Sequence, residues 1–140
     1  FYINLSYFLI PMKIKTSSDL VKNALEEIET ISPNDAKKLN NDKICNLIDI
    51  RDIRELNRDG KISGALHIPR GMLEFWFDPT SPYFKEGKID PSKTIVLFCA
   101  AGMRSALAAK TLQDMGFQKV AHINGGFQAM KQEGFEIEKE

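Results

Sequence analysis

The sequence has few of the residues that mark small disulfide-bonded or metal-binding proteins. It contains two cysteines and two histidines in 140 residues, which is too few for a disulfide scaffold. No spacing of these residues with one another or with carboxylates matches a metal-ligand set. Repeats and low-complexity stretches are also missing. The sequence therefore predicts neither a disulfide framework nor a metal site, and each thiol has to be considered as a candidate for chemistry.

An excess of charge of one sign is also absent. Nineteen Lys and Arg residues balance nineteen Asp and Glu residues, and the sequence pI is about 6.9. No overall field attracts the chain to nucleic acid or to an anionic membrane, so an anionic ligand has to be bound by a local cluster. The hydrophobic and charged fractions, 43% and 27%, are typical of soluble globular proteins. The length favours one domain.

The first eleven residues contain no charged side chain, yet they are shorter than the roughly 20 apolar residues that span a bilayer. They lack the basic leader and the cleavage site of a secretory signal. Three interpretations stay open: a cloning or upstream remnant, an arm packed on the domain or on a second copy, and a shortened membrane signal. We expect residues 1–16 to be an apolar extension and residues 17–140 to be the folded domain. A cytoplasmic location is expected unless the apolar start is the remainder of a targeting segment.

Hydrophobic periodicity predicts helices that alternate with strands. Helices are expected over residues 17–30, 33–40, 52–58, 105–115 and 127–133, with a helical turn over 71–77. Strands are expected over residues 44–50, 64–69, 94–98 and 120–123. This order predicts βαβ units and an α/β layer with a parallel sheet. Because ligands bind beyond the carboxyl ends of such strands, the pattern points to Asp49 and Arg51 and to the residues after Phe98.

The segment after the most apolar strand has the features of a thiolate site. Residues 99–104 read CAAGMR and precede a helix. Small residues and Gly102 allow successive backbone N–H groups to point at one spot, the helix adds a partial positive charge, and Arg104 adds a permanent cation. Such surroundings lower a cysteine pKa from about 8.5 to between about 3.5 and 7.5. Cys99 is predicted to be an activated nucleophile facing an anion site; the alternative is a buried structural cysteine.

Four segments together resemble the rhodanese family of single-domain sulfurtransferases. They are residues 47–51 (LIDIR), 64–69 (GALHIP), 99–104 (CAAGMR) and 125–127 (GGF). The resemblance implies a three-layer α/β fold with a central, mostly parallel five-stranded sheet and helices on both faces. It also implies a reaction in which Cys99 takes a sulfane sulfur from a small anionic donor, such as thiosulfate or a persulfide. The sulfur then passes to cyanide, a thiol or a protein acceptor, with no metal or organic cofactor.

The resemblance implies roles for particular residues. Cys99 is expected to be catalytic, and the persulfide and substrate are expected to be bound by Ala100, Ala101, Gly102, Met103, Arg104 and Arg51. Asp49 is expected to brace the loop through hydrogen bonds, and Arg51 is expected to lie near the substrate entrance; a surface ion pair is the alternative for both. Arg70 and Trp76 are candidates for the pocket rim or for simple packing.

Two other functions stay open. Related phosphatases place five residues between cysteine and arginine, whereas this chain has four, so a phosphatase or arsenate reductase is the weaker enzymatic alternative. The other is a non-catalytic rhodanese-like module that binds a protein partner. Inactive relatives usually lack the cysteine, and this chain retains it.

The remaining cysteine and the two histidines are interpreted as structural. His67 and His122 are more typical of satisfied buried side chains than of bases. Cys45 lies about four residues upstream of Asp49, and so roughly 13 Å from the reactive edge at ~3.3 Å per residue. A disulfide requires Cα atoms within about 7 Å. Cys45 is therefore expected to be passive.

Overall fold

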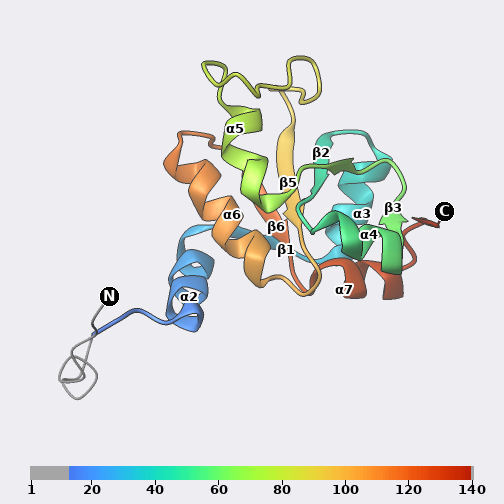
Figure 1. Cartoon of the computed structure of the whole chain (residues 1–140). Coiled ribbons are helices and arrows are strands. Elements are labelled where there is room, and N and C mark those ends of the chain that lie inside the picture. Colours follow the sequence, from blue (N-terminus) through green and yellow to red (C-terminus); the bar gives the residue numbers. More distant parts are fainter. Residues whose placement is uncertain (1–12, 140) are drawn as a thin grey trace.

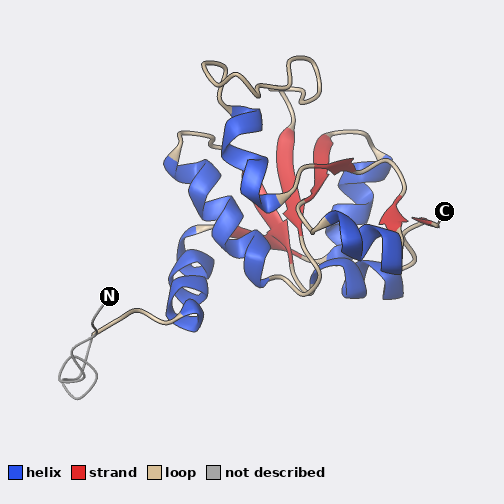
Figure 2. Ribbon diagram, in the orientation of Figure 1, coloured by secondary structure: helices blue, strands red, loops and turns tan. Residues whose placement is uncertain are grey.

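Five parallel strands form the centre of the structure, a computed structural model that describes residues 13–139 (Figures 1 and 2). The strand order is β1-β6-β5-β2-β4. The strands are β1 (Glu29–Ile31), β2 (Cys45–Asp49), β4 (Leu66–His67), β5 (Thr94–Phe98) and β6 (Val120–Ile123). The predicted α/β fold with a five-stranded, mostly parallel sheet is confirmed. Residues 1–12 of the expected extension lie outside the described residues.

Helices cover both faces of this sheet, as Figures 1 and 2 show. One face carries α2 (Ser17–Glu27), α5 (Leu73–Phe77) and α6 (Met103–Asp114), with a 3₁₀ turn (Arg70–Met72) before α5; the other carries α3 (Pro33–Asn41), α4 (Ile53–Asp59) and α7 (Gly126–Gln132). Along β5, Leu97 and Cys99 belong to the core under α5 and α6, whereas Val96 and Phe98 belong to the core under α3 and α7. The strand is therefore buried on both faces, as its unbroken apolar run predicted.

One predicted helix extends too far, and one pair of strands was not predicted. The helix expected over residues 17–30 ends at Glu27, because Ile28 turns to extended geometry and Glu29–Ile31 pairs with β6 as an edge strand. Tertiary pairing here overrides the helical periodicity. The antiparallel pair β3 (Lys61–Ile62) and β7 (Ile137–Glu138) was not predicted, since two-residue strands are too short to show alternation.

The strand register brings the chemically interesting segments to one edge. Asp49 at the end of β2 is aligned with Phe98 on one side and with His67 of β4 on the other. Leu97 is aligned with His122 of β6. Because all these strands run in the same direction, the loop that begins at Cys99 lies beside the segments that follow β2, β4 and β6, at the lower end of β5 in Figure 1.

No helix within residues 13–139 is both long and apolar enough to cross a lipid bilayer.

Candidate active site

The loop between β5 and α6 wraps around the sulfur of Cys99. Gly102, the N-cap of α6, has φ +110°, a conformation that L side chains rarely adopt. This turn points the Gly102 N–H at Sγ, at an N···S distance of 3.1 Å. The helix begins two residues earlier than predicted, at Met103. The sulfur consequently lies directly in front of the α6 amino terminus, where the partial positive charge of the helix is concentrated.

The surroundings of Cys99 favour its anionic form. Burial by itself raises the pKa of the thiol, but hydrogen bonds from the Ser105 hydroxyl and from the backbone amides of Ser105, Gly102 and Ala101 outweigh it, and the pKa lies below its ordinary value. Only 1% of Cys99 is exposed, whereas Met103 is 63% exposed. The sulfur therefore lies at the base of a ring of loop atoms, and a donor has to enter this ring.

Arg104 lies between the sulfur and a carboxylate that sequence reasoning missed. Its guanidinium donates to both oxygens of Glu55 on α4, at 2.8 and 2.9 Å, and the Glu55 carboxylate and the Cys99 sulfur both raise the pKa of Arg104. Glu55 also accepts from the Asp52 N–H as the third residue of a capping box. The D-x-x-E pattern was readable as a helix start, but it gave no sign of a partner 49 residues away.

Neutralising Glu55 should activate the sulfur. In Glu55→Gln the amide preserves the capping box, while Arg104 loses its counter-charge and exerts its full positive field on Cys99. We expect the thiolate pKa to fall and alkylation of Cys99 by iodoacetamide at neutral pH to accelerate about two- to fivefold. The gain should shrink at high salt. Unchanged or slower alkylation would show that Glu55 matters for the position of Arg104 rather than for its charge.

The loop is held from below by α7. The Phe127 N–H donates to the Cys99 carbonyl at 2.8 Å, and the Gln128 N–H approaches the Ala100 carbonyl at 3.4 Å. This contact needs glycine at position 126, because a Cβ there would lie 2.4 Å from the Cys99 carbonyl oxygen. Gly126 of the GGF segment therefore allows the loop and α7 to touch.

Two expected roles differ in the structure. Arg51 was expected near the substrate entrance, but its side chain is completely buried, with Nη2 2.8 Å from Asp49 and 2.9 Å from the Gly60 carbonyl. Asp49 was expected to bond the loop, but the hydrogen bonds that its carboxylate accepts come from Arg51. The Arg51 guanidinium stacks 4.0 Å from the Phe127 ring on α7. Asp49 therefore supports the loop only indirectly, because it positions Arg51, which packs on α7.

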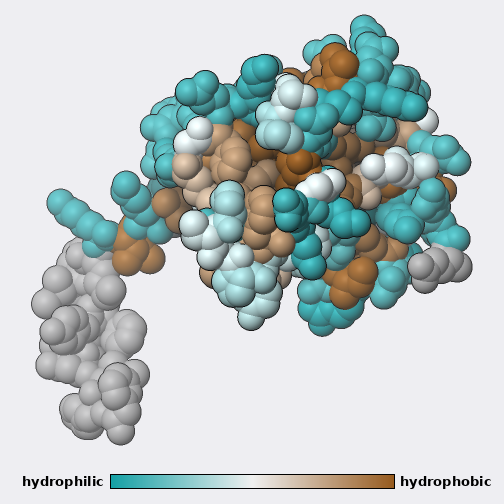
Figure 3. Space-filling view, turned by 90° about the horizontal axis from the view of Figure 1, so that it is seen from above, coloured by the Kyte–Doolittle hydropathy of each residue, from teal (hydrophilic) through white to brown (hydrophobic). Residues whose placement is uncertain are grey.

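Of the two rim candidates, Arg70 pairs with other side chains, and Trp76 lies at the end of β5 opposite to Cys99. Arg70 donates to Glu74 at 2.7 Å and to the Thr111 hydroxyl at 3.3 Å. Trp76 lines an apolar cavity of about 260 Å³ that also includes Ile95, at the end where β5 begins, whereas Cys99 follows the other end. Figure 3 views the molecule from above and shows hydrophobic surface near the middle of that face, with hydrophilic side chains around it. Trp76 is therefore not at the mouth of the cysteine loop.

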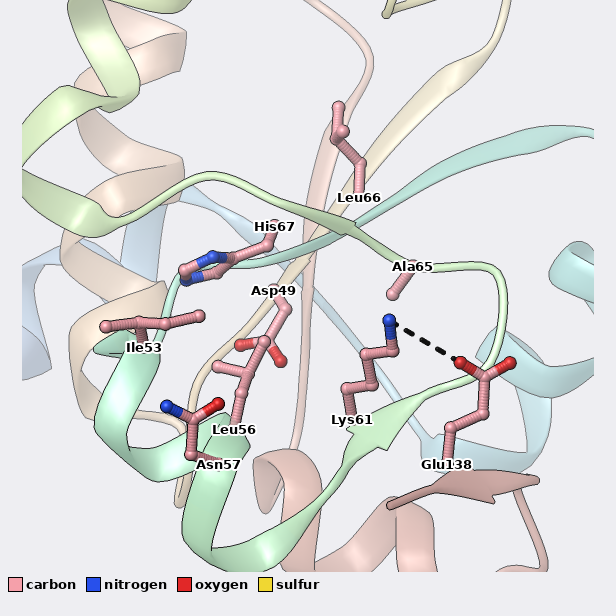
Figure 4. A pocket seen from close by; sticks show the side chains of 9 residues that line it. All are labelled: Asp49, Ile53, Leu56, Asn57, Lys61, Ala65, Leu66, His67 and Glu138. Carbon is pink, nitrogen blue, oxygen red and sulfur yellow. Dashed lines mark ion pairs between the residues drawn. The ribbon is translucent and has the colours of Figure 1, made fainter. Parts of the chain in front are cut away.

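Another cavity, of about 420 Å³, lies beside α4 (Figure 4). Its lining includes Asp49 and His67 from the ends of β2 and β4, and the Lys61–Glu138 ion pair at 3.6 Å crosses one side. Cys99 is not among its lining residues. Because Asp49 is committed to Arg51 and the His67 Nε2 to the Arg51 carbonyl, this cavity lacks the features of the reactive centre.

Both histidines are hydrogen-bonded, as expected for structural residues. His122 is buried between Ser105 and Thr30, at 2.9 and 3.0 Å, and burial lowers its pKa to about 4. Cys45 is half-buried on β2, aligned with Thr94 at the opposite end of β5 from Cys99. Within residues 13–139, no three His, Cys, Asp or Glu side chains gather as a metal site.

A parallel α/β sheet with a cysteine cradled at the amino terminus of the helix that follows β5 defines a class of thiolate proteins. Within that class, the rhodanese-like domain family model matches residues 32–133, and the chain belongs to this family. The mouse protein named thiosulfate sulfurtransferase/rhodanese-like domain-containing protein 3 is 36% identical over 95 residues, which are 65% of this chain and 60% of that protein. The chain spans 43% of the Bacillus subtilis relative YrkF.

Solved structures support the same assignment. RPA3614 of Rhodopseudomonas palustris, described as a protein of unknown function and possible tyrosine phosphatase, is 47% identical with a TM-score of 0.84 over 92% of this chain and 99% of that chain. The polysulfide-sulfur transferase of Wolinella succinogenes, a homodimer, is 34% identical with a TM-score of 0.68 over 86% and 85% of the two chains. Both matches extend over most of this chain and agree with the fold described above.

Proposed function

We propose that this protein is a sulfurtransferase in which Cys99 carries the transferred sulfur as a persulfide. The observation that carries the proposal is the cradle itself: an amide donor 3.1 Å from Sγ, a thiol pKa held below its ordinary value and the Arg104 cation beside it. Donors arranged in advance around a developing negative charge stabilise that charge without reorganising. The same donors serve a thiolate and the anion of a persulfide.

The reaction has two displacement steps. The Cys99 thiolate attacks the outer sulfur of thiosulfate, the bond between that sulfur and the sulfonate breaks, and sulfite leaves with the electron pair. In the second step a thiolate or cyanide attacks the outer sulfur of the persulfide and regenerates the Cys99 thiolate. Neither step requires a general acid or base, because every attacking and leaving group is an anion. A persulfide or polysulfide donor reacts in the same way, with a thiolate or a shorter polysulfide as the leaving group.

The loop residues divide this work. Ala100, Ala101 and Gly102 contribute amides and leave room above the sulfur, since none has a side chain larger than a methyl group. Arg104 attracts the donor anion, and Met103 at the exposed side of the loop contacts the acceptor.

A cytoplasmic location belongs to the same proposal, because a free thiolate persists where thiols are kept reduced.

Mass spectrometry after incubation with thiosulfate tests the proposal. The protein should gain one sulfur atom, lose it on addition of cyanide or a thiol, and gain none in Cys99→Ser. Cys45→Ser is the matched control and should behave as the wild type, because Cys45 lies at the other end of the strands. Loading should weaken as the pH falls through the lowered pKa of Cys99, since only the thiolate attacks. A sulfur that persists in Cys99→Ser would refute the assignment.

A hydrolysis assay distinguishes the sulfurtransferase from the alternative phosphatase. Four residues separate Cys99 from Arg104, and the resulting ring is sized for a single sulfur rather than for a phosphoryl group. The purified protein should not hydrolyse a phosphotyrosine analogue while it transfers sulfur. Hydrolysis without sulfur loading would favour the phosphatase over the sulfurtransferase. A protein with neither activity would act as a binding module.

A further inference from the structure

A line of four side chains connects the reactive sulfur with the exposed edge of the sheet. The Cys99 Sγ lies 3.6 Å from the Ser105 hydroxyl, which lies 2.9 Å from Nδ1 of His122. Nε2 of the same imidazole lies 3.0 Å from the hydroxyl of Thr30 on the edge strand β1. The first three residues are at most 2% exposed, whereas Thr30 is exposed. We call these four residues the hydrogen-bond chain.

Two arrangements use every link of the hydrogen-bond chain. Burial lowers the pKa of His122 to about 4, so the imidazole is neutral near physiological pH and carries one N–H. A neutral imidazole donates from one nitrogen and accepts at the other, and each hydroxyl donates one hydrogen bond. The Ser105 hydroxyl also has the Gly102 carbonyl as an acceptor, at 3.3 Å. When the Ser105 proton stays within the hydrogen-bond chain, all links donate in the same direction, either away from the sulfur or toward it.

The protonation of the sulfur selects the direction. A Cys99 thiol donates to Ser105, Ser105 then donates to Nδ1, and the imidazole holds its proton on Nε2 and donates to Thr30. A sulfur without a proton can only accept, and its negative charge makes it a stronger acceptor than the Gly102 carbonyl, so Ser105 donates to Sγ. Nδ1 must then carry the proton to donate to Ser105, and Thr30 donates to Nε2. A thiolate and the inner sulfur of a persulfide both impose this second arrangement.

We propose that Ser105, His122 and Thr30 form a relay that follows the proton of Cys99. On ionisation the thiol proton passes to Ser105, the Ser105 proton to Nδ1, the Nε2 proton to Thr30 and the Thr30 proton to water. The net change is one proton released to solvent and one tautomer of a neutral imidazole converted into the other. His122 acts as a positioning residue that keeps the Ser105 hydroxyl directed at the charged sulfur. The usefulness of this relay rests on the proposed role of Cys99 as the nucleophile.

The charged groups around the hydrogen-bond chain do not impose either direction. The charged side chains of the elements packed against it include Arg104 on α6, Glu55 on α4, Asp49 and Arg51 at the end of β2, Glu29 on β1 and, further along α6, Lys110, which pairs with Asp114 and with Glu27 of α2. The first four form two ion pairs with each other. Glu29 precedes Thr30 on an edge strand, where alternate side chains point to opposite faces. Burial is the cause of the lowered His122 pKa, with no charged partner involved.

Nitrogen NMR of the imidazoles tests the relay directly. The experiment uses the Cys45→Ser protein, so that Cys99 is the remaining thiol. The second histidine is an internal reference, because the His67 Nε2 faces the Arg51 carbonyl at 2.7 Å and must hold its proton there. Between about pH 5.5 and about pH 10, His122 should change from the Nε2–H to the Nδ1–H tautomer, with the midpoint at the Cys99 pKa obtained from thiolate absorbance. A single tautomer throughout the Cys99 titration would overturn the proposal.

Two variants separate the relay from mere packing. Cys99→Ser keeps a protonated donor at the position of the sulfur and should hold His122 as Nε2–H at every pH. Ser105→Ala should uncouple the imidazole from Cys99 and slow iodoacetamide alkylation at neutral pH about tenfold, the loss of one hydrogen bond to an anion. A tautomer change that persists in either variant would refute the relay.

His122 itself is tested by a pair of substitutions. His122→Leu should slow alkylation of Cys99 because Ser105 can then turn to the nearby Gly102 carbonyl, 3.3 Å away. His122→Asn places an amide near the position of Nδ1 and should restore part of the rate. Equal alkylation profiles for Leu, Asn and His would overturn the positioning role. A protein that shows the tautomer change but gains no sulfur from thiosulfate would refute the proposed function and leave the relay intact. A protein that gains sulfur but shows no tautomer change would refute the relay alone.

Discussion

Replacing Gly126 with alanine should reduce sulfur transfer at least about a hundredfold, the scale expected when a reactive group moves by about 1 Å. The added Cβ would lie 2.4 Å from the Cys99 carbonyl oxygen and 2.8 Å from the Ala100 carbonyl. These are backbone atoms and cannot move aside without moving the loop. The hydrogen bond from Phe127 to Cys99 has to break, and the amides that cradle the sulfur move with it.

Two matched glycine variants distinguish this clash from ordinary backbone strain. Gly64 also has a positive φ, +81°, but a Cβ there meets nothing within 4 Å, so Gly64→Ala should lose about 1–2 kcal/mol of stability and keep its activity. At Gly125 the Cβ meets the Ala129 side chain at 2.7 Å, and Gly125→Ala should lose stability with a smaller loss of transfer. Sulfur loading and chemical denaturation of the three variants provide the comparison. Equal activity in Gly126→Ala and Gly64→Ala would contradict the inference that contact with α7 holds the cysteine loop in place.

Removing the carboxylate of Asp49 should destabilise the whole domain. The Arg51 side chain is 1% exposed and the Asp49 side chain 2% exposed, and the pair is joined by three side-chain hydrogen bonds of 2.8, 3.0 and 3.1 Å. Breaking such a pair leaves one charge buried without its partner, at a typical cost of about 3–5 kcal/mol. Asp49→Ala should therefore lower the free energy of unfolding by about that amount. The stacking of Arg51 on Phe127 would transmit part of the disturbance to the cysteine loop.

Asp59→Ala is the control for this prediction. Its partner Arg58 lies on the surface, and the two side chains are 69% and 42% exposed. Exposed ion pairs contribute little, because water and salt screen them. The urea midpoint of Asp59→Ala should consequently stay close to that of the wild type, while the midpoint of Asp49→Ala falls clearly. Similar midpoints for the two variants would mean that Arg51 finds water or another acceptor when Asp49 is lost.

Local sequence was sufficient to predict the strand and the loop that position Cys99. The apolar run before Cys99 identified a strand buried on both faces, and the small residues after it, with Gly102, identified the loop. Both depend on interactions within a few residues: side-chain burial along one strand, and backbone freedom at one glycine. The order of strands and helices was sufficient for a parallel α/β sheet, since parallel neighbours require crossover helices.

Contacts between distant segments could not be predicted in this way. Arg51 follows a strand end and was expected at the surface near the substrate; the structure buries it, because Asp49, the Gly60 carbonyl and the Phe127 ring together offset the loss of water. Glu55 was recognisable as a capping residue and not as the partner of Arg104. Sequence periodicity reports which side of an element is apolar, and it does not report which polar groups meet across elements.

The amino-acid sequence by itself determined that this is an α/β protein with a cysteine directly after its most buried strand. The tertiary structure alone decided what surrounds that cysteine: α7 under the loop, Glu55 against Arg104, and Ser105 and His122 behind the sulfur. The physical reason is the range of the interactions. Strand burial and loop curvature are settled within a few residues of the chain. The charge and proton state of Sγ depend instead on Glu55 of α4, His122 of β6 and Thr30 of β1. Only folding brings these residues into hydrogen-bond contact with Arg104, with Ser105 and with each other.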